Sequence, residues 1–136
     1  MRRGDAIARA RTAVAVTIML LIVLVHGLRV GARLQDPLFT YYYSYFSDLV
    51  VPFGAYFLLW MQDARVPLLR DWRSKALLVF AAASATEILQ AFGVHLLGTT
   101  FDPLDFVMFG VGVLLAVLVD KLLFDRLGLA LARPAR

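Results

Sequence analysis

The chain contains no cysteine among its 136 residues. This absence excludes a disulfide framework, thiolate catalysis, and zinc or iron–sulfur sites built on cysteine. Charge is also scarce, because Asp, Glu, Lys and Arg make up 18% of the chain, against about 25% in soluble proteins. The sequence has no internal repeat, nucleotide-binding loop, haem signature or redox motif. It therefore singles out no catalytic residue, no cofactor and no strong metal-binding motif.

Apolar residues dominate what remains. They form 61% of the chain, and the mean hydropathy is +0.76. A chain of this length has too little interior to hide so much apolar surface from water. The composition excludes an ordinary cytosolic domain, a disordered chain and a collagen-like fibre, and it indicates a bilayer as the main solvent. We expect one domain covering residues 1–136.

Four apolar stretches predict an all-α membrane protein, a four-transmembrane-helix bundle with approximate spans 12–28, 44–61, 76–95 and 105–124. The first has 17 residues without a charge, near the lower length for crossing the hydrocarbon core. Aromatic residues between 39 and 46 predict an interfacial belt, and Trp60 suits the opposite interface. Near the end of the fourth stretch, Asp120 and Lys121 are expected to reach water by snorkelling.

The distribution of Lys and Arg predicts the topology. With four spans, twelve of these residues fall at the two termini and in the second loop, and two fall in the first loop. The positive-inside rule then places both termini in the cytoplasm. The basic residues lie in clusters separated by apolar stretches, so we expect no nucleic-acid partner.

This topology places most of the unusual polar residues in the outer half of the bundle. Glu87 lies near the midplane of the third span, where an unpaired carboxyl group is costly and is by default a candidate functional residue. Ser84, Glu87 and Gln90 have i, i+3, i+6 spacing and share one helix face, which is expected to point inward. We predict an outward-facing polar pocket whose candidate ligand-binding residues are Asp48, Glu87, Gln90, Asp102, Asp105, His95 and Arg29, with His26 nearby.

Each of these residues also has a simpler interpretation. Asp102 and Asp105 stand where a helix begins, so either could only cap it. His95 could be an ordinary loop residue. Glu87 could be a protonated or arginine-paired glutamate that holds helices together, with Arg29 as a loosely placed partner.

Two short motifs resemble a known family. Glu87-Ile88-Leu89-Gln90, then Phe101-Asp102-Pro103-Leu104-Asp105 and a glycine-bearing apolar helix, resemble the VanZ-like integral membrane family. Phe46-Ser47-Asp48-Leu49, with Trp60 downstream, looks more like a small relative of that family, of unknown function, in which an aspartate opens the second helix. The resemblance covers about residues 40–120. It implies a small bacterial inner-membrane protein with a role in the cell envelope.

Three functions remain open. The leading hypothesis is a pocket that binds an envelope or lipid-linked ligand, with membrane lipids as partners. The second is an intramembrane enzyme acting on a lipid, with Glu87 as acid or base, or with Asp48, Asp102, Asp105 and His95 around a divalent metal. The third is a proton- or ion-coupled carrier, or an accessory subunit. Four spans are few for a monomeric carrier, so that hypothesis calls for a homo-oligomer.

Overall fold

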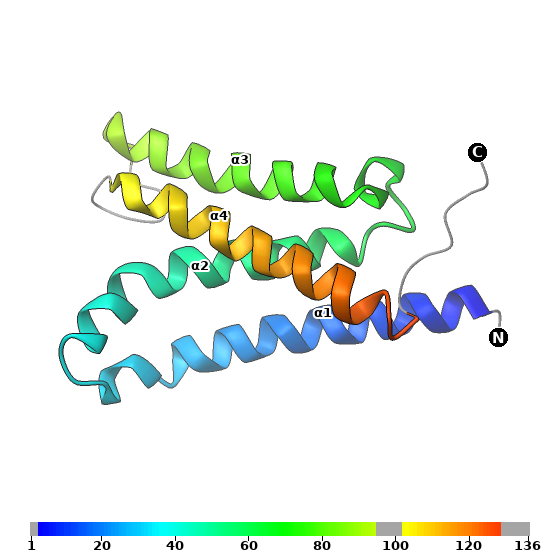
Figure 1. Ribbon diagram of the computed structural model, residues 1–136, viewed down its shortest axis with the longest axis horizontal. Coiled ribbons are helices and arrows are strands. Elements are labelled where there is room, and N and C mark those ends of the chain that lie inside the picture. The colour runs from blue at the N-terminus through cyan, green and yellow to red at the C-terminus, as the bar shows by residue number, and fades with distance from the viewer. Residues whose placement is uncertain (1–2, 95–101, 129–136) are drawn as a thin grey trace.

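The computed structural model describes residues 3–94 and 102–128, without the side chains of Arg3 and Tyr43. Within these residues the protein is all-helical (Figure 1). The long helices are α1 (Arg3–Gly27), α2 (Leu38–Trp60), α3 (Trp72–Ala91) and α4 (Pro103–Leu118). Two short 3₁₀ segments, η1 (Val30–Arg33) and η2 (Pro67–Arg70), precede α2 and α3, and a π-helical segment, η3 (Val119–Phe124), continues α4.

Each helix runs antiparallel to the one before it in the chain (Figure 1). One end of the molecule, called here the α1–α2 end, holds the turn between α1 and α2, the end of α3 and the start of α4. The opposite end, called the terminal end, holds the start of α1, the connection between α2 and α3, and η3. All four predicted helices are therefore present, and each begins earlier in the chain than its predicted span.

Local sequence explains where the helices begin. Asp71 caps α3 by accepting a hydrogen bond from the backbone N–H of Arg73. Asp102 caps α4 in the same way from Leu104 N–H, with Pro103 at the first helical position, where a missing N–H costs nothing. The capping interpretation of Asp102 is thus confirmed. Helix α2 continues through Pro52, although proline has no N–H to donate to the carbonyl of Asp48.

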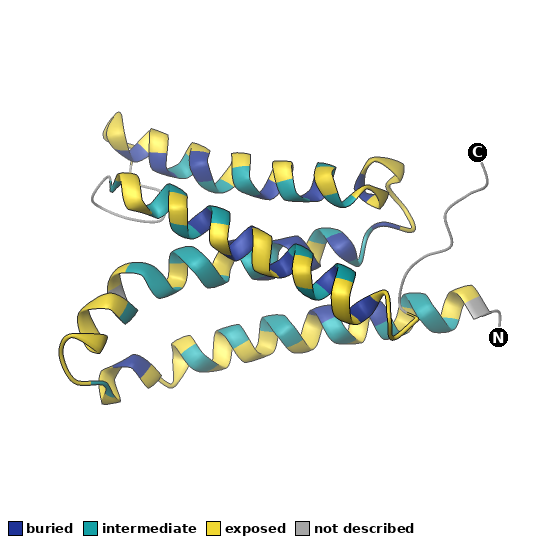
Figure 2. Ribbon diagram, viewed as in Figure 1, coloured by how far each residue is buried: buried dark blue, intermediate teal, exposed yellow. Residues whose placement is uncertain are grey.

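Helix α2 is the centre of the fold, because it packs against α1, α3 and α4. The main core lies toward the terminal end and consists of Ala15, Tyr56, Phe57, Trp60, Val79, Val113, Ala116 and Phe124 (Figure 2). Trp60 is 1% exposed, so its ring faces the core, and its place at the level of a membrane interface stays a prediction. Its indole is covered by Phe57 and Phe124.

Gly112 sets how closely α4 approaches α2. A Cβ atom at this position would collide with the backbone carbonyl of Leu49. Ala116, one turn further along the same face, is fully buried. The small-xxx-small pair therefore lies in the helix interface, as such pairs do when helix backbones pack in lipid.

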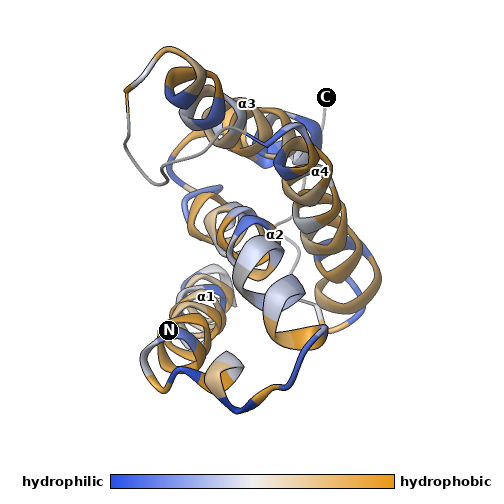
Figure 3. Ribbon diagram, turned by 90° about the vertical axis from the view of Figure 1, so that its left-hand side faces the viewer, coloured by the Kyte–Doolittle hydropathy of each residue, from blue (hydrophilic) through white to orange (hydrophobic). Residues whose placement is uncertain are grey.

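Two of the described helical segments, Gly4–Gly27 and Pro103–Phe124, are long and apolar enough to cross a membrane. Most of their surface faces outward rather than into the core (Figure 2). On α1, Leu20, Leu21 and Val23 are more than half exposed. Apolar residues dominate the helices (Figure 3), and many of their large apolar side chains are exposed. An apolar exterior of this extent is unusual in a monomeric soluble protein.

Candidate functional site

Four acidic residues from three helices meet at the α1–α2 end. Asp48 lies on α2, Glu87 on α3, and Asp102 and Asp105 at the start of α4. The Asp48 carboxyl is close enough to Glu87, Asp102 and Asp105 for all three to act on it electrostatically, and the same holds for Asp105 and the other three carboxyls. We call these four residues the acidic cluster.

Glu87 and Asp102 are joined through the backbone. The Oε1 atom of Glu87 accepts a hydrogen bond from the Asp102 N–H at 2.8 Å. The Asp102 carboxylate accepts from Leu104 N–H at 2.9 Å and from the Tyr45 hydroxyl at 3.5 Å. Asp102 thus caps α4 and belongs to the cluster at the same time, so its two interpretations do not compete.

The face of α3 that carries Glu87 points into the bundle, as its spacing predicts. Glu87 is 2% exposed, and Ser84 and Gln90 are each 9% exposed. The Ser84 Oγ and Gln90 Oε1 atoms are buried and have no hydrogen-bond partner among the described residues. A buried polar atom without a partner is costly, so this face offers a ligand two further hydrogen-bonding groups beside the carboxyls.

The chemistry of the acidic cluster follows from its contacts. Carboxyl groups brought this close repel one another when they are ionised, and a shared proton or a bound cation relieves this repulsion. Within the described part of the chain, no Lys or Arg forms an ion pair with any of the four carboxyls. The cluster is suited to holding protons, a cation or a group rich in hydrogen-bond donors.

Arg29, another predicted site residue, does not join this cluster. Arg29 follows the end of α1 and lies with His26, Tyr42 and Ser47 around a separate hollow. It makes no ion pair with Glu87, so the loose pairing considered from the sequence is absent. His95 lies outside the described residues. Among the residues that are described, no three His, Asp or Glu side chains are placed to hold a metal ion.

A second polar cluster lies buried at the terminal end, and the sequence analysis missed it. Asp63 Oδ2 accepts from Arg11 at 2.6 Å and from Lys75 at 3.0 Å. These residues are 4%, 3% and 1% exposed. Arg11 also donates to the Trp60 carbonyl, and its guanidinium lies over the Trp60 ring. Burial raises the pKa of the Asp63 carboxyl, and the two cations oppose this effect.

Asp120 belongs to the same end and does not reach water. It is 2% exposed and accepts from the Tyr56 hydroxyl at 2.6 Å and from Trp60 Nε1 at 2.8 Å. The predicted snorkelling of Asp120 is therefore wrong, whereas the side chain of Lys121 is 35% exposed. The one available signal was positional: residues 11, 63, 75 and 120 all lie near those ends of the predicted spans that an antiparallel bundle brings together.

No family model, no characterised protein sequence and no solved structure matches this chain.

Proposed function

We propose that the chain is a multi-pass protein of the bacterial cytoplasmic membrane, in which all four helices span the bilayer and both termini face the cytoplasm. The antiparallel order of the helices supports this arrangement (Figure 1), as does the excess of Lys and Arg at the terminal end. The exposed apolar face of α1, which packs against α2 and η1 alone within the described chain, is the surface that lipid or a second copy of the chain would cover.

At the outward-facing α1–α2 end, we propose that the acidic cluster binds an envelope or lipid-linked ligand through a cationic or polyhydroxylated group. The observation that carries this proposal is the meeting of four carboxyls from three helices with no basic partner among the described residues. Glu87 is buried and the other three are half-buried. A buried carboxylate without a cation is costly, so a purely structural role for Glu87 would favour a Lys or Arg partner. The resemblance to the VanZ-like family is consistent with a role in the envelope and stays part of the proposal.

The close approach of Asp48 and Asp105 favours one alternative, a proton-coupled carrier or an accessory subunit of one, because neighbouring carboxyls can share and release protons. In that case the cluster exchanges protons as a ligand moves. The two functions differ in a measurable way, because a carrier would acidify or alkalinise the lumen of proteoliposomes when its ligand is supplied, and a binding protein would not.

Native mass spectrometry of the full chain from mild detergent tests the binding proposal. We expect a co-purifying lipid or lipid-linked species on the wild type and its loss in Glu87→Gln and Asp105→Asn. Asp71→Asn is the matched control, because Asp71 is an exposed cap at the other end of α3 and asparagine caps helices equally well. Retention of the same species by all three variants would contradict the proposed site.

Reporter fusions test the topology independently. Fusions at the C-terminus and within residues 62–75 should report the cytoplasm, and fusions within residues 30–40 and 97–100 should report the exterior. An external C-terminus would contradict the four-span arrangement and would move the acidic cluster to the cytoplasmic side.

A further inference from the structure

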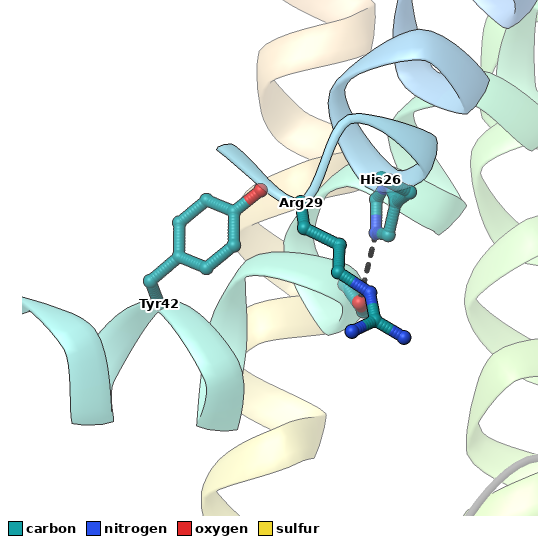
Figure 4. Close-up of a pocket in the computed structure, with 4 residues that line it drawn as sticks. His26, Arg29 and Tyr42 are labelled. Atoms are coloured by element: carbon teal, nitrogen blue, oxygen red, sulfur yellow. Dashed lines mark hydrogen bonds between the residues drawn. The ribbon is translucent and has the colours of Figure 1, made fainter. Parts of the chain in front are cut away.

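A hollow of about 350 Å³ lies beside α2 at the α1–α2 end, lined by His26, Arg29, Tyr42 and Ser47 (Figure 4). It is separate from the acidic cluster. Ser47 and Asp48 are consecutive residues of α2, and consecutive side chains on a helix point about 100° apart. The hollow therefore opens toward α1, and the acidic cluster faces α3 and α4.

Contacts within the hollow hold His26 in place. Its Nδ1 lies 2.9 Å from the carbonyl oxygen of Ile22, and its Nε2 lies 3.0 Å from Ser47 Oγ. A carbonyl oxygen only accepts, so Nδ1 carries a proton. The ring also packs against Phe46, with the ring centroids 5.6 Å apart. The imidazole and the Ser47 hydroxyl thus form a preorganised polar wall.

Arg29 adopts an unusual backbone conformation that brings its side chain to this wall. Its φ of 48° and ψ of 46° lie in the left-handed region, which L-residues other than Gly, Asn and Asp rarely adopt. The guanidinium extends toward the His26–Ser47 pair (Figure 4). Among the described residues, no carboxylate forms an ion pair with it. Strain of this kind persists where the surrounding structure uses the residue.

We propose that this hollow binds the phosphate of an anionic phospholipid headgroup. A guanidinium fork matches two phosphate oxygens, and the serine hydroxyl can donate to a third. The position favours a lipid over free phosphate, because Arg29 lies two residues beyond the apolar segment Gly4–Gly27 and beside the aromatic start of α2. Arginine and tyrosine at this level of a membrane helix meet the headgroups.

The test is a titration of the detergent-solubilised full chain with phosphatidylglycerol, diacylglycerol and inorganic phosphate, read by native mass spectrometry. We expect phosphatidylglycerol to bind at least about tenfold more tightly than diacylglycerol, since at least one charge-assisted hydrogen bond distinguishes them. Arg29→Gln should remove this preference. Arg33→Gln is the control, because Arg33 is an exposed arginine of the same turn that does not line the hollow.

Equal binding of diacylglycerol would overturn the proposal, since it would show recognition of acyl chains alone. Inorganic phosphate that competes at the concentration of the lipid would overturn the choice of a lipid ligand. An effect of Arg33→Gln as large as that of Arg29→Gln would show a general charge effect and not a site.

Arg29→Gly separates binding from folding. Glycine adopts a φ of 48° without strain, so this variant should unfold at the same temperature as the wild type or higher, while losing the phosphatidylglycerol preference. A lower unfolding temperature with the preference intact would assign Arg29 a structural role instead. The inference does not depend on the acidic cluster, and Asp71→Asn, an exposed cap outside both sites, should bind phosphatidylglycerol as the wild type does.

Discussion

Asp63→Asn is expected to destabilise the bundle strongly, because Asp63 compensates two buried cations at once. Arg11 and Lys75 both donate to its Oδ2 atom and are 3% and 1% exposed. Removing one partner of a buried ion pair typically costs about 3–5 kcal/mol, since the remaining charge stays away from water.

The contacts that survive place the expected loss at the lower end of this range. Arg11 keeps its hydrogen bond to the Trp60 carbonyl and its contact with the Trp60 ring. Lys75 keeps its hydrogen bond to the Leu69 carbonyl oxygen, at 2.9 Å. Asparagine also retains one carbonyl oxygen that can accept from either cation. We therefore expect a loss of about 3 kcal/mol in the free energy of unfolding.

A double-mutant cycle in detergent, read by denaturant or thermal unfolding, measures this effect. Lys75→Met alone leaves the pair of Asp63 with Arg11 and should cost less, about 1.5–3 kcal/mol. The double variant should be more stable than Asp63→Asn alone, because one of the uncompensated cations is gone. Asp125→Asn is the control, since that exposed residue pairs only across one helical turn with Lys121 and should change stability by about 0.5 kcal/mol or less. If Asp63→Asn also cost only about 0.5 kcal/mol or less, the argument that the buried cations need this carboxylate would be refuted.

Two further substitutions test the packing and the acidic cluster. Gly112→Ala should cost about 1–3 kcal/mol in the free energy of unfolding, because its Cβ meets the Leu49 carbonyl and α4 must move away from α2. Gly110→Ala is the control and should be neutral or stabilising, because its Cβ would touch only a side-chain atom at 3.8 Å. Equal losses for the two variants would contradict the close approach of α4 to α2. Glu87→Gln should leave the unfolding temperature unchanged or slightly higher, because glutamine still accepts from the Asp102 N–H and carries no charge to desolvate. A sharp fall in that temperature, with ligand retention intact, would show that Glu87 is structural.

Residue patterns along the chain were enough to predict the helices and part of the site. Apolar stretches and the low charge content predict four helices because backbone groups in an apolar environment must be hydrogen-bonded within the chain. The spacing of Ser84, Glu87 and Gln90 predicts one inward face, since helix periodicity is a local property. The cap at Asp102 is local as well, because it depends on the N–H groups of the next turn alone.

Only the tertiary structure decided which polar groups meet. The rotation and crossing of α2 and α4, set by the contact of Gly112 with Leu49, bring Asp48 to Asp105. Position along a span says how deep a residue lies but not which way it points. For that reason Arg29, predicted beside the acidic residues, faces another hollow across α2.

The same distinction explains Asp120, which was expected to reach water because it lies near a helix end. Its carboxylate instead finds two donors from α2, the Tyr56 hydroxyl and the Trp60 indole. Those residues are 64 and 60 positions away in the chain. Snorkelling depends on side-chain length and depth, both visible in a sequence, whereas a buried hydrogen-bonding partner exists only after the helices have packed.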